Sequence, residues 1–499
     1  MFPKANPGFY NLIREMRVVL LNAPSAGTYG PLEKASGRYF PLGLGYIAAF
    51  LRRRGHEPYI IDPEAEGLSD DAVAARLASL APRLCGITSA TPSFPSARRL
   101  AAMVKRVLPG TPVVLGGVHA SAVPERALRE APEADLVAAG EGEETMAELA
   151  QALGEGALSP GVCSGIRGIW YRDGDAVRSA PPRPVIEPLD SHPIPARDLV
   201  DLSLYRPHAH NRRGRRAATA VTSRGCPFRC IFCASKVVLG DRYRSHGAAY
   251  VVGELEEMAG RFGVDQVIFN DDIFTFNRER DLEICDLMLK KGLKLQWFCF
   301  ARVDTVSREV LKAMRRAGCY SIGFGVESGD EGMLKAMRKT VTLDRVRESL
   351  AMANELGFKT QCFFVFGAPG ETRETVEKTI AFAKELKPVL CFFNMLVPYP
   401  GTEAYEIVFG PPGPPLGRPA WEDWVAIGPR STYKVPGLGP LETAVAEANR
   451  RFYYRPAQVL RMLRHASSFS EVLQLARGAL ALLIQILAWR RAEEKPPEA

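Results

Sequence analysis

The sequence predicts an α/β protein with two parallel sheets, an open doubly wound sheet and then a partial barrel of six βα units, followed by a helical C-terminal region. Three features of the 499 residues indicate this fold: short apolar segments alternate with amphipathic ones over 17–155, a proline-rich passage follows, and the alternation resumes over 218–397. Short buried strands separated by amphipathic helices are typical of parallel sheets. A chain of this length has room for two or three domains.

The first predicted domain, residues 1–155, contains five strand candidates. These strands are expected at 17–21, 59–62, 84–88, 113–117 and 136–139, with helices at 42–54, 70–80, 96–108, 124–130 and 143–153. The order predicts a Rossmann-like sheet, and such sheets bind their ligands outside the carboxyl ends of the strands.

Small and polar residues follow three of these strands. Glycine lets a backbone approach a bulky ligand closely, and small hydroxyl groups can hydrogen-bond its polar rim. Alternatively, these glycines form only tight turns between strand and helix. No G-x-G-x-x-G sequence follows the first strand, which argues against an ordinary dinucleotide site. The candidate ligand-binding residues are Thr88, Ser89, Gly116, Gly117, Gly140, Glu141 and Gly142.

Prolines concentrate between 181 and 195, inside a segment (156–205) that we expect to be a linker. The next domain, 206–410, is expected to contain strands at 218–222, 266–270, 295–300, 321–326, 360–366 and 391–397. Six units are too few for a closed eight-stranded barrel, but they suit a partial TIM-type barrel with its chemistry at the carboxyl ends of the strands. The last region, 411–499, begins rich in proline and glycine and then becomes helical in pattern.

Three cysteines directly follow the first barrel strand. Cys226, Cys230 and Cys233 have the spacing C-x-x-x-C-x-x-C, and no fourth Cys or His lies at a short spacing. A four-iron cluster held this way keeps one iron open to another molecule, whereas a closed structural zinc site needs four ligands. The alternative is three buried cysteines packed as small apolar side chains. The remaining cysteines are scattered singly, a pattern typical of reduced thiols in a cytoplasmic protein.

Together with the domain order, this cysteine loop resembles that of cobalamin-binding radical S-adenosylmethionine (SAM) enzymes. The resemblance covers nearly the whole chain and also includes the segments 41–46, 116–119 and 140–145. It implies a [4Fe–4S] cluster on the three cysteines, SAM bound through its amino and carboxylate groups at the open iron, and cobalamin in the first domain. One electron would then cleave the SAM sulfonium to methionine and a 5′-deoxyadenosyl radical. A flavodoxin or ferredoxin is the implied electron donor.

The resemblance also implies contacts with SAM from residues that end later barrel strands. Two aspartates would meet the methionine amino group or the substrate, an arginine the carboxylate in a bidentate pair, a Glu-Ser pair the ribose, and two glycines the adenine. Alternatively, the aspartates cap a helix, the arginine and glutamate pair with each other, and the glycines form only a turn. In that order the residues are Asp271, Asp272, Arg302, Glu327, Ser328, Gly367 and Gly370.

One motif of many cobalamin domains is missing from this chain. That motif, D-x-H-x-x-G after the first strand, supplies a histidine ligand to cobalt, but the loop 22–40 contains neither His nor Asp. The lower face of cobalt is therefore expected to be empty, water-bound or held from elsewhere. His119, in the segment 116–119, is the nearest candidate for a histidine ligand to cobalt. Alternatively, it is an ordinary hydrogen-bonded turn residue.

The resemblance favours methyl transfer to an unactivated carbon or phosphorus centre. The deoxyadenosyl radical would abstract a hydrogen atom, and the substrate radical would take a methyl group from methylcobalamin. The alternatives are radical oxidation or ring closure, as in anaerobic porphyrin cyclases, and a non-catalytic cobalamin-binding sensor. Methylthiolation is disfavoured, because neither the extra N-terminal cysteines nor the C-terminal RNA-binding barrel of that related family is evident.

The C-terminal region is basic, with eight arginines and one acidic residue between 450 and 491. Its apolar run, 478–489, is shorter than the roughly 20 residues that span a bilayer. A helix docked on the preceding domain is one interpretation, and an amphipathic helix that contacts a membrane surface or a lipid or tetrapyrrole substrate is the other. The net charge of +8 gives no reason to expect nucleic acid, and the N-terminus lacks the pattern of a signal peptide. We expect a cytoplasmic protein with possible peripheral membrane contact.

Overall fold

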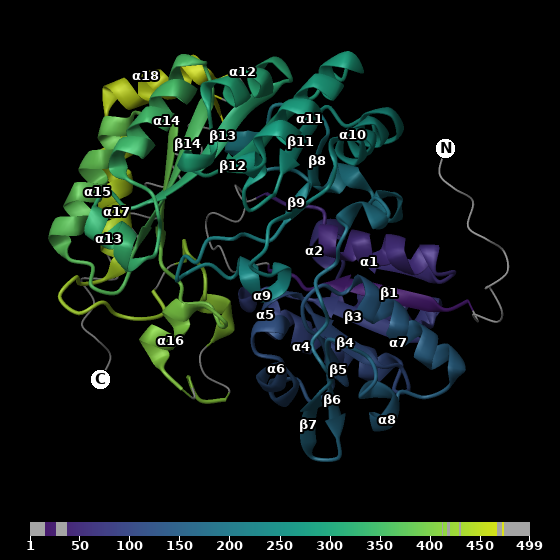
Figure 1. Cartoon of the computed structure of the whole chain (residues 1–499). Coiled ribbons are helices and arrows are strands. Elements are labelled where there is room, and N and C mark those ends of the chain that lie inside the picture. Colours follow the sequence, from purple (N-terminus) through teal and green to yellow (C-terminus); the bar gives the residue numbers. More distant parts are fainter. Residues whose placement is uncertain are drawn as a thin grey trace. The chain divides into compact units, whose positions relative to one another are not determined.

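The computed structural model (Figure 1) describes residues 15–25, 37–411, 413–416, 420–428, 431–466 and 472–473. The described chain divides into two compact units. The first contains residues from 1–24, 41–186 and 191–200, and the second contains residues from 25–40, 187–190 and 201–499. Within the described ranges we find no helix with the length and apolarity to cross a membrane. The basic apolar run at 478–489 lies outside the described residues.

The first unit is built on one sheet. Its strands are β1 (Arg17–Asn22), β2 (Glu57–Ile61), β3 (Leu84–Thr88), β4 (Val113–Gly116), β5 (Leu136–Ala138), β6 (Ile169–Asp173) and β7 (Ala176–Ser179). They lie in the order β2-β1-β3-β4-β5-β6-β7, and β1 to β5 run parallel. The strand order reverses at β1 and β3, so a ligand site is expected beyond their carboxyl ends. The prediction of a doubly wound sheet is confirmed.

The buried residues of the parallel strands are mainly apolar, as is usual for a parallel sheet with helices on both faces. Val18, Val19, Leu20 and Leu21 of β1 are each at most 1% exposed. The helices of the first unit are α1 (Leu42–Arg53), α2 (Pro63–Glu66), α3 (Asp70–Leu80), α4 (Phe94–Val107), α5 (Gly117–Ala122), α6 (Pro124–Glu130), α7 (Glu143–Glu155) and α8 (Pro160–Cys163).

The segment 156–205 is more than the linker that the sequence predicted, because β6 and β7 extend the sheet as an antiparallel hairpin. Gly174, in the left-handed region at φ +59°, makes the turn between them. Only Ile169 and Tyr171 of the hairpin are buried, and β7 has no buried residue. Such a short edge hairpin has almost no periodic apolar signal, so the sequence concealed it. Division into domains at 155, 205 and 410 stays a proposal.

The second unit contains the partial barrel. Its strands are β8 (Ala217–Ala220), β11 (Gln266–Phe269), β12 (Gln296–Ala301), β13 (Cys319–Glu327), β14 (Lys359–Phe366) and β15 (Leu390–Met395). They form one parallel sheet in the order β15-β14-β13-β12-β11-β8, in which each strand pairs with its neighbour in sequence. A separate antiparallel pair, β9 (Ser223–Arg224) and β10 (Arg244–Ser245), follows β8. The predicted six βα units are confirmed.

Helices cover the outer face of this sheet, as Figure 1 shows for α10, α11, α12 and α14. Cys362, Phe364 and Phe366 of β14 are fully buried against this layer, whereas the alternate residues Phe363 and Val365 are partly exposed on the inner face. The helices of the unit are α9 (Ser235–Leu239), α10 (Ala248–Phe262), α11 (Arg278–Lys290), α12 (Arg308–Arg316), α13 (Glu331–Ala336), α14 (Leu343–Glu355), α15 (Arg373–Leu386), α16 (Glu403–Phe409), α17 (Leu441–Tyr453) and α18 (Pro456–His465).

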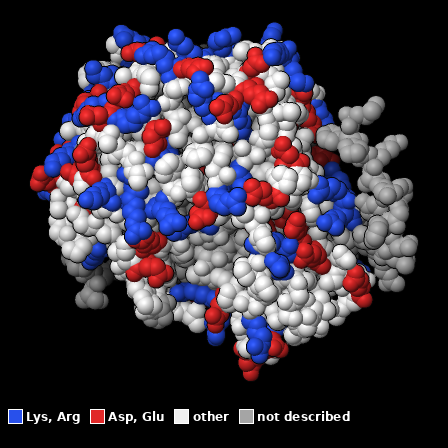
Figure 2. All heavy atoms as spheres, viewed as in Figure 1, with Lys and Arg blue, Asp and Glu red and all other residues white. Residues whose placement is uncertain are grey.

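The described part of the C-terminal region contains the helices α17 and α18, as predicted, and α17 packs against the edge strand β15. The Tyr453 hydroxyl donates to the carbonyl oxygen of Cys391 at 2.5 Å and accepts from its N–H at 3.0 Å. Side chains of both charge signs are interspersed on the face seen in Figure 2. Exposed pairs such as Arg308–Glu355 contribute at most about 1 kcal/mol each. The apolar cores therefore carry most of the stability.

Candidate functional site

The cysteine loop begins six residues after the end of β8, at the carboxyl edge of the barrel. Cys226, Cys230 and Cys233 are partly exposed, whereas the seven other cysteines of the chain are buried. The structure therefore does not support the alternative of three core cysteines. Gly225 introduces the loop at φ +82°, where an added Cβ would lie 2.3 Å from the carbonyl oxygen of Arg242. Only glycine fits this position.

Backbone hydrogen bonds dock the cysteine loop onto two later elements of the barrel. The N–H of Ile231 donates to the carbonyl oxygen of Met337, after α13, at 3.2 Å. The N–H of Ala404, in α16, donates to the carbonyl oxygen of Ile231 at 2.9 Å. Both bonds fall between Cys230 and Cys233, so the middle of the loop is fixed while the thiols flank it.

Burial raises the pKa of all three thiols, that of Cys233 to about 11. Iron binds thiolates, so cluster assembly has to displace three protons. No three His, Cys, Asp or Glu side chains of the described residues are grouped to hold a single metal ion. A four-iron cluster offers a separate iron to each thiolate, so its ligands need not converge on one point.

Asp271, predicted to contact SAM, holds the chain between β8 and the cysteine loop. Its Oδ1 accepts from the N–H of Thr222 at 3.0 Å, the Thr222 hydroxyl at 2.8 Å and the Ser223 hydroxyl at 2.5 Å. Asp271 is 2% exposed, and burial raises its pKa against the opposing charge of Arg280. The other oxygen, Oδ2, has no hydrogen-bond partner among the described residues. Asp271 thus orients the loop, and one buried acceptor atom stays available.

Arg280 on α11 supports the same junction and was not singled out in the sequence. Its Nε donates to the carbonyl oxygen of His246 at 2.7 Å, and its Nη2 donates to that of Thr222 at 2.9 Å. The side chain is 6% exposed. Arginine in a charge-rich helix segment normally points to solvent, so no sequence signal distinguishes it.

Asp272, the second predicted aspartate, is exposed and lies beside the cysteines. Its Oδ2 accepts from the hydroxyl of Ser235, the first residue of α9. Its negative charge adds to the rise in the pKa of Cys226 and Cys233 that burial causes. Asp272 therefore lies close to the cysteines, its contact with SAM stays a prediction, and it does not cap α11, whose N-cap is Asn277.

Arg302 follows β12 and is 5% exposed. Its Nε and Nη2 donate to the two carboxylate oxygens of Asp304 at 3.0 and 2.8 Å. The guanidinium carbon lies 3.4 Å from the centroid of the Phe228 ring, inside the cysteine loop. The alternative pairing with Glu327 is therefore not formed. Contact of Arg302 with the SAM carboxylate stays a prediction.

Glu327 ends β13 in the left-handed region, at φ +70°, where the register with β14 shifts. Its Oε1 accepts from Nζ of Lys339 at 2.9 Å, and both residues are 7% exposed. The charges of both contribute to the pKa of Cys230, so this ion pair lies beside the cysteine loop. A non-glycine residue at positive φ costs free energy and is held by its surroundings, here by the buried pair.

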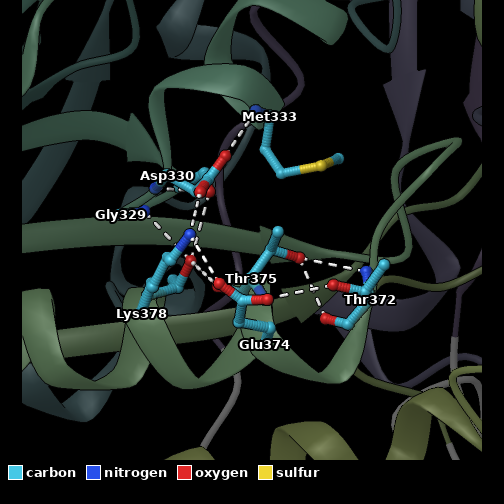
Figure 3. A network of polar contacts seen from close by, with 9 residues as sticks. Gly329, Asp330, Met333, Thr372, Glu374, Thr375 and Lys378 are labelled. Carbon is cyan, nitrogen blue, oxygen red and sulfur yellow. Dashed lines mark hydrogen bonds and ion pairs between the residues drawn. The ribbon is translucent and has the colours of Figure 1, made fainter.

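Ser328, the predicted partner of Glu327 at the SAM ribose, is 1% exposed and packs toward α15. Its hydroxyl lies 3.1 Å from that of Thr379 and accepts from the N–H of Asp330 at 3.2 Å. Figure 3 shows how Asp330 then accepts from the N–H of Met333 at 3.0 Å and from Nζ of Lys378 at 3.1 Å. This network fixes the backbone of the loop after β13.

The loop after β14 contains both glycines predicted to pass the adenine. Gly367 and Gly370 have positive φ, +100° and +83°. The N–H of Gly367 donates to Oε2 of Glu371, and the N–H of Glu371 donates to the carbonyl oxygen of Ala368 at 3.0 Å. Glu371 is 2% exposed, and burial raises its pKa to about 7. No separate role was predicted for this carboxyl group, which directly follows Gly370.

In the first unit, three predicted residues meet beyond the carboxyl ends of β3 and β4. Gly117 has φ +88°, and a Cβ there would lie 2.4 Å from the carbonyl oxygen of Ser89 and 2.7 Å from Oγ1 of Thr88. The two loops can approach so closely only because residue 117 is glycine. The buried hydroxyl of Ser89 has no hydrogen-bond partner among the described residues. Gly116, directly before Gly117, is the last residue of β4.

The loop after β5 holds Gly140, Glu141 and Gly142. The N–H of Gly140 donates to Ser121 Oγ at 3.0 Å, and a Cβ at Gly140 would meet no described atom within 4 Å. Glu141 is 7% exposed, and its Oε2 accepts from the N–H of Ile186 at 2.7 Å. Glu141 therefore holds the segment that follows the hairpin, which the sequence did not predict.

His119, considered in the sequence as a cobalt ligand, is fully buried. Its Nδ1 lies 3.2 Å from the Thr91 hydroxyl, and its ring lies 4.2 Å from that of Phe94. Burial lowers its pKa to about 3. These contacts fit the alternative, an ordinary hydrogen-bonded residue.

Comparison with known proteins identifies the family to which this chain belongs. Residues 31–150 match the B12 binding domain family, and residues 220–383 match the radical SAM superfamily. An uncharacterized methyltransferase of Pyrococcus horikoshii is 32% identical over 473 residues, which are 95% of this chain and 100% of that protein. This chain belongs to the cobalamin-binding radical SAM enzymes. Its cofactors are a [4Fe–4S] cluster, SAM and cobalamin.

A further relative and a similar solved structure support this family assignment. The anaerobic magnesium-protoporphyrin IX monomethyl ester cyclase of Cereibacter sphaeroides is 30% identical, over 78% of this chain and 63% of that protein. The structure of the radical SAM methyltransferase TsrM from Kitasatospora setae, with cobalamin and a [4Fe–4S] cluster bound, superposes with a TM-score of 0.70. It is 20% identical and covers 96% of this chain and 100% of that chain, so the likeness is one of fold.

The residues present in each unit fit the family's cofactors. The barrel edge offers three partly exposed thiols and an unpartnered buried carboxylate oxygen on Asp271. The sheet edge offers the unpartnered hydroxyl of Ser89 and, at Gly140, backbone that a ligand can approach. Buried polar atoms without partners are costly, and a polar ligand removes that cost.

Proposed function

We propose that this enzyme transfers a methyl group to an unactivated carbon or phosphorus centre of a small-molecule substrate. The observation that carries the proposal is the alignment with a methyltransferase over that protein's whole length, in a chain that also carries the cysteine loop. When bound, the cluster supplies the electron that cleaves SAM, and cobalamin carries the methyl group. The protein's own residues bind and orient these groups and exclude water from them.

In the second unit, Cys226, Cys230 and Cys233 would hold the cluster. Asp272 borders it, and the unpartnered Oδ2 of Asp271 suits the positively charged amino group of SAM. The loops fixed by the Glu327–Lys339 ion pair and by Glu371 would shape the remainder of the SAM site. The SAM contacts that we propose are Asp271, Asp272, Arg302, Glu327, Ser328, Gly367 and Gly370.

In the first unit, the residues beyond β3, β4 and β5 would hold cobalamin. Gly140 would let the backbone approach the ring, Gly117 lets the loops after β3 and β4 approach each other, and Ser89 would donate to the polar rim of the ring. Glu141 would act indirectly, through its bond to Ile186. The residues of the cobalamin site that we propose are Thr88, Ser89, Gly116, Gly117, Gly140, Glu141 and Gly142.

A flavodoxin or ferredoxin is the proposed electron donor, and the cytoplasm the proposed location. The basic residues after 450 support peripheral contact with an anionic membrane. Deletion after residue 477 should then weaken co-sedimentation with vesicles that contain anionic lipid, and unchanged co-sedimentation would exclude this contact.

A second candidate function is radical oxidation or ring closure. It is favoured by the 30% identity to an anaerobic magnesium-protoporphyrin cyclase. The two functions differ in whether a methyl group enters the product.

Labelled SAM separates these functions. The full chain is reconstituted anaerobically with iron, sulfide and cobalamin and incubated with cell extract, reductant and SAM that carries a deuterated methyl group. Methyl transfer predicts a product that gains the labelled methyl group together with S-adenosylhomocysteine. Ring closure without the label would overturn the proposal. In the control variant, with Cys226, Cys230 and Cys233 replaced by alanine, reductive cleavage of SAM should be absent.

A further inference from the structure

The guanidinium of Arg302 lies against the cysteine loop itself. Phe228 sits midway between Cys226 and Cys230, and its ring centroid is 3.4 Å from the guanidinium carbon. This is close contact of a cation with an aromatic face, and arginine stacks in this way more readily than lysine does. The contact joins the end of β12 to the segment between Cys226 and Cys230.

Asp304 locks this stack in place. The two hydrogen bonds from Arg302 to Asp304 are bidentate, and Nη2 also lies 3.4 Å from the Thr340 hydroxyl. A bidentate pair fixes the plane of the guanidinium as well as its position. Because Arg302 is 5% exposed, water screens its charge little.

A fixed, weakly screened cation beside the loop has a consequence for any cluster that the loop holds. Reduction adds one negative charge to the cluster, and nearby positive charge favours the more negative state. Net charge and solvent exposure are among the factors that set the reduction potential of iron–sulfur clusters. Asp304 carries the opposite charge and is the more exposed partner, with 29% of its side chain accessible against 6% for Arg302.

We propose that Arg302 is a positioning residue that holds Phe228 and the cysteine loop and raises the reduction potential of the cluster. The proposal rests on the cluster bound by Cys226, Cys230 and Cys233, and it is independent of what the enzyme methylates. It adds a contact of the same guanidinium with the cysteine loop to the proposed contact with SAM.

The test is a reductive titration of the cluster, followed by electron paramagnetic resonance, in the anaerobically reconstituted full chain. Arg302→Met removes the charge and is expected to shift the midpoint potential to more negative values. Asp304→Asn removes the opposing charge and is expected to shift it to more positive values. Phe228→Leu keeps both charges and should lower iron content or broaden the signal. Arg308→Met, at an exposed ion pair on α12, is the matched control and should leave the midpoint unchanged.

Opposite shifts in the Arg302 and Asp304 variants support the proposal, because a general disturbance of the fold would move both in one direction. An unchanged midpoint in Arg302→Met with full iron content overturns it. A loss of SAM binding in that variant with an unchanged midpoint also overturns it and returns Arg302 to the SAM carboxylate. If Arg302→Met does not fold, Asp304→Asn decides alone, and an unchanged or more negative midpoint overturns the proposal.

Discussion

The hydroxyl of Tyr433 donates a hydrogen bond to the carbonyl oxygen of Gly367, so a residue of the C-terminal region holds the loop after β14. The same glycine lies against α17, because a Cβ at Gly367 would be 2.5 Å from Cδ1 of Leu441. The C-terminal region thus contacts the proposed adenine loop from two directions. Its role in the enzyme is not confined to covering the edge of the barrel.

Tyr433→Phe should weaken SAM binding while leaving the barrel folded. The substitution removes one partly buried hydrogen bond, which costs about 1 kcal/mol, or roughly fivefold in affinity. Equilibrium dialysis with SAM under anaerobic conditions measures the effect. Tyr454→Phe, at a tyrosine that is 45% exposed, is the control. Equal SAM affinity in both variants would show that the Tyr433 bond does not shape the site.

Glu371 predicts a pH dependence of stability, because burial raises its pKa from 4.5 to about 7. Below pH 4.5 the carboxyl group is neutral in the folded and the unfolded chain, and its contribution to the stability of the folded chain is fully present. Between pH 4.5 and 7 the unfolded chain loses the proton first, so stability falls as the pH rises. The loss amounts to about 3 kcal/mol when complete.

Glu371→Gln keeps a neutral side chain at every pH and should abolish this loss. Thermal unfolding of the second unit is measured from pH 5 to 8. The melting temperature of the wild type should fall with rising pH relative to that of the variant. Glu374→Gln, at an exposed pair with Lys378, should run parallel to the wild type. A constant difference between wild type and Glu371→Gln would contradict the predicted ionisation.

The buried pair of Glu327 and Lys339 predicts a strong asymmetry between single and double variants. Lys339→Met alone leaves an unpaired buried carboxylate and should destabilise the second unit by about 3 kcal/mol or more. The double variant with Glu327→Gln removes that charge and should recover part of the loss. Melting temperatures and SAM affinity are measured together. Recovery of stability without recovery of SAM binding would assign Glu327 a direct contact with SAM.

Gly117→Ala should impair cobalamin binding. The added Cβ meets the Ser89 carbonyl oxygen and forces a left-handed backbone on alanine, which alone costs about 1–2 kcal/mol. Gly154→Ala is the matched control, because Gly154 lies in α7 and its Cβ would meet no described atom within 4 Å. Absorbance spectra of the full chain titrated with cobalamin report the affinity. Equal affinities in the two variants would exclude the β3–β4 loops from the site.

The alternation of apolar strands and amphipathic helices predicted both sheets, because burial on both faces of a parallel sheet leaves a clear periodic pattern. The β6–β7 hairpin escaped because it buries only Ile169 and Tyr171. The cysteine loop was predictable because its three cysteines are close together in sequence.

Contacts between distant strand ends were not predictable in the same way. Arg302 was expected to meet SAM or Glu327, but its Nε and Nη2 donate to Asp304, only two residues away. Asp271 was expected at the ligand, yet Thr222 and Ser223 occupy one of its oxygens. The partner of a charged side chain depends on where neighbouring strands end relative to one another, and the sequence does not specify those positions.

The backbone partners of Ile231 have a consequence for synthesis of the chain. Cys226 to Cys233 leave the ribosome well before Met337 and Ala404, whose backbone groups fix the middle of their loop. The segment between Cys230 and Cys233 therefore lacks both of these backbone bonds until most of the barrel has been made. A nascent or truncated chain that ends before residue 404 would lack the bond from Ala404 to Ile231, so we expect the loop to reach its final shape for iron and sulfide only after the barrel is complete.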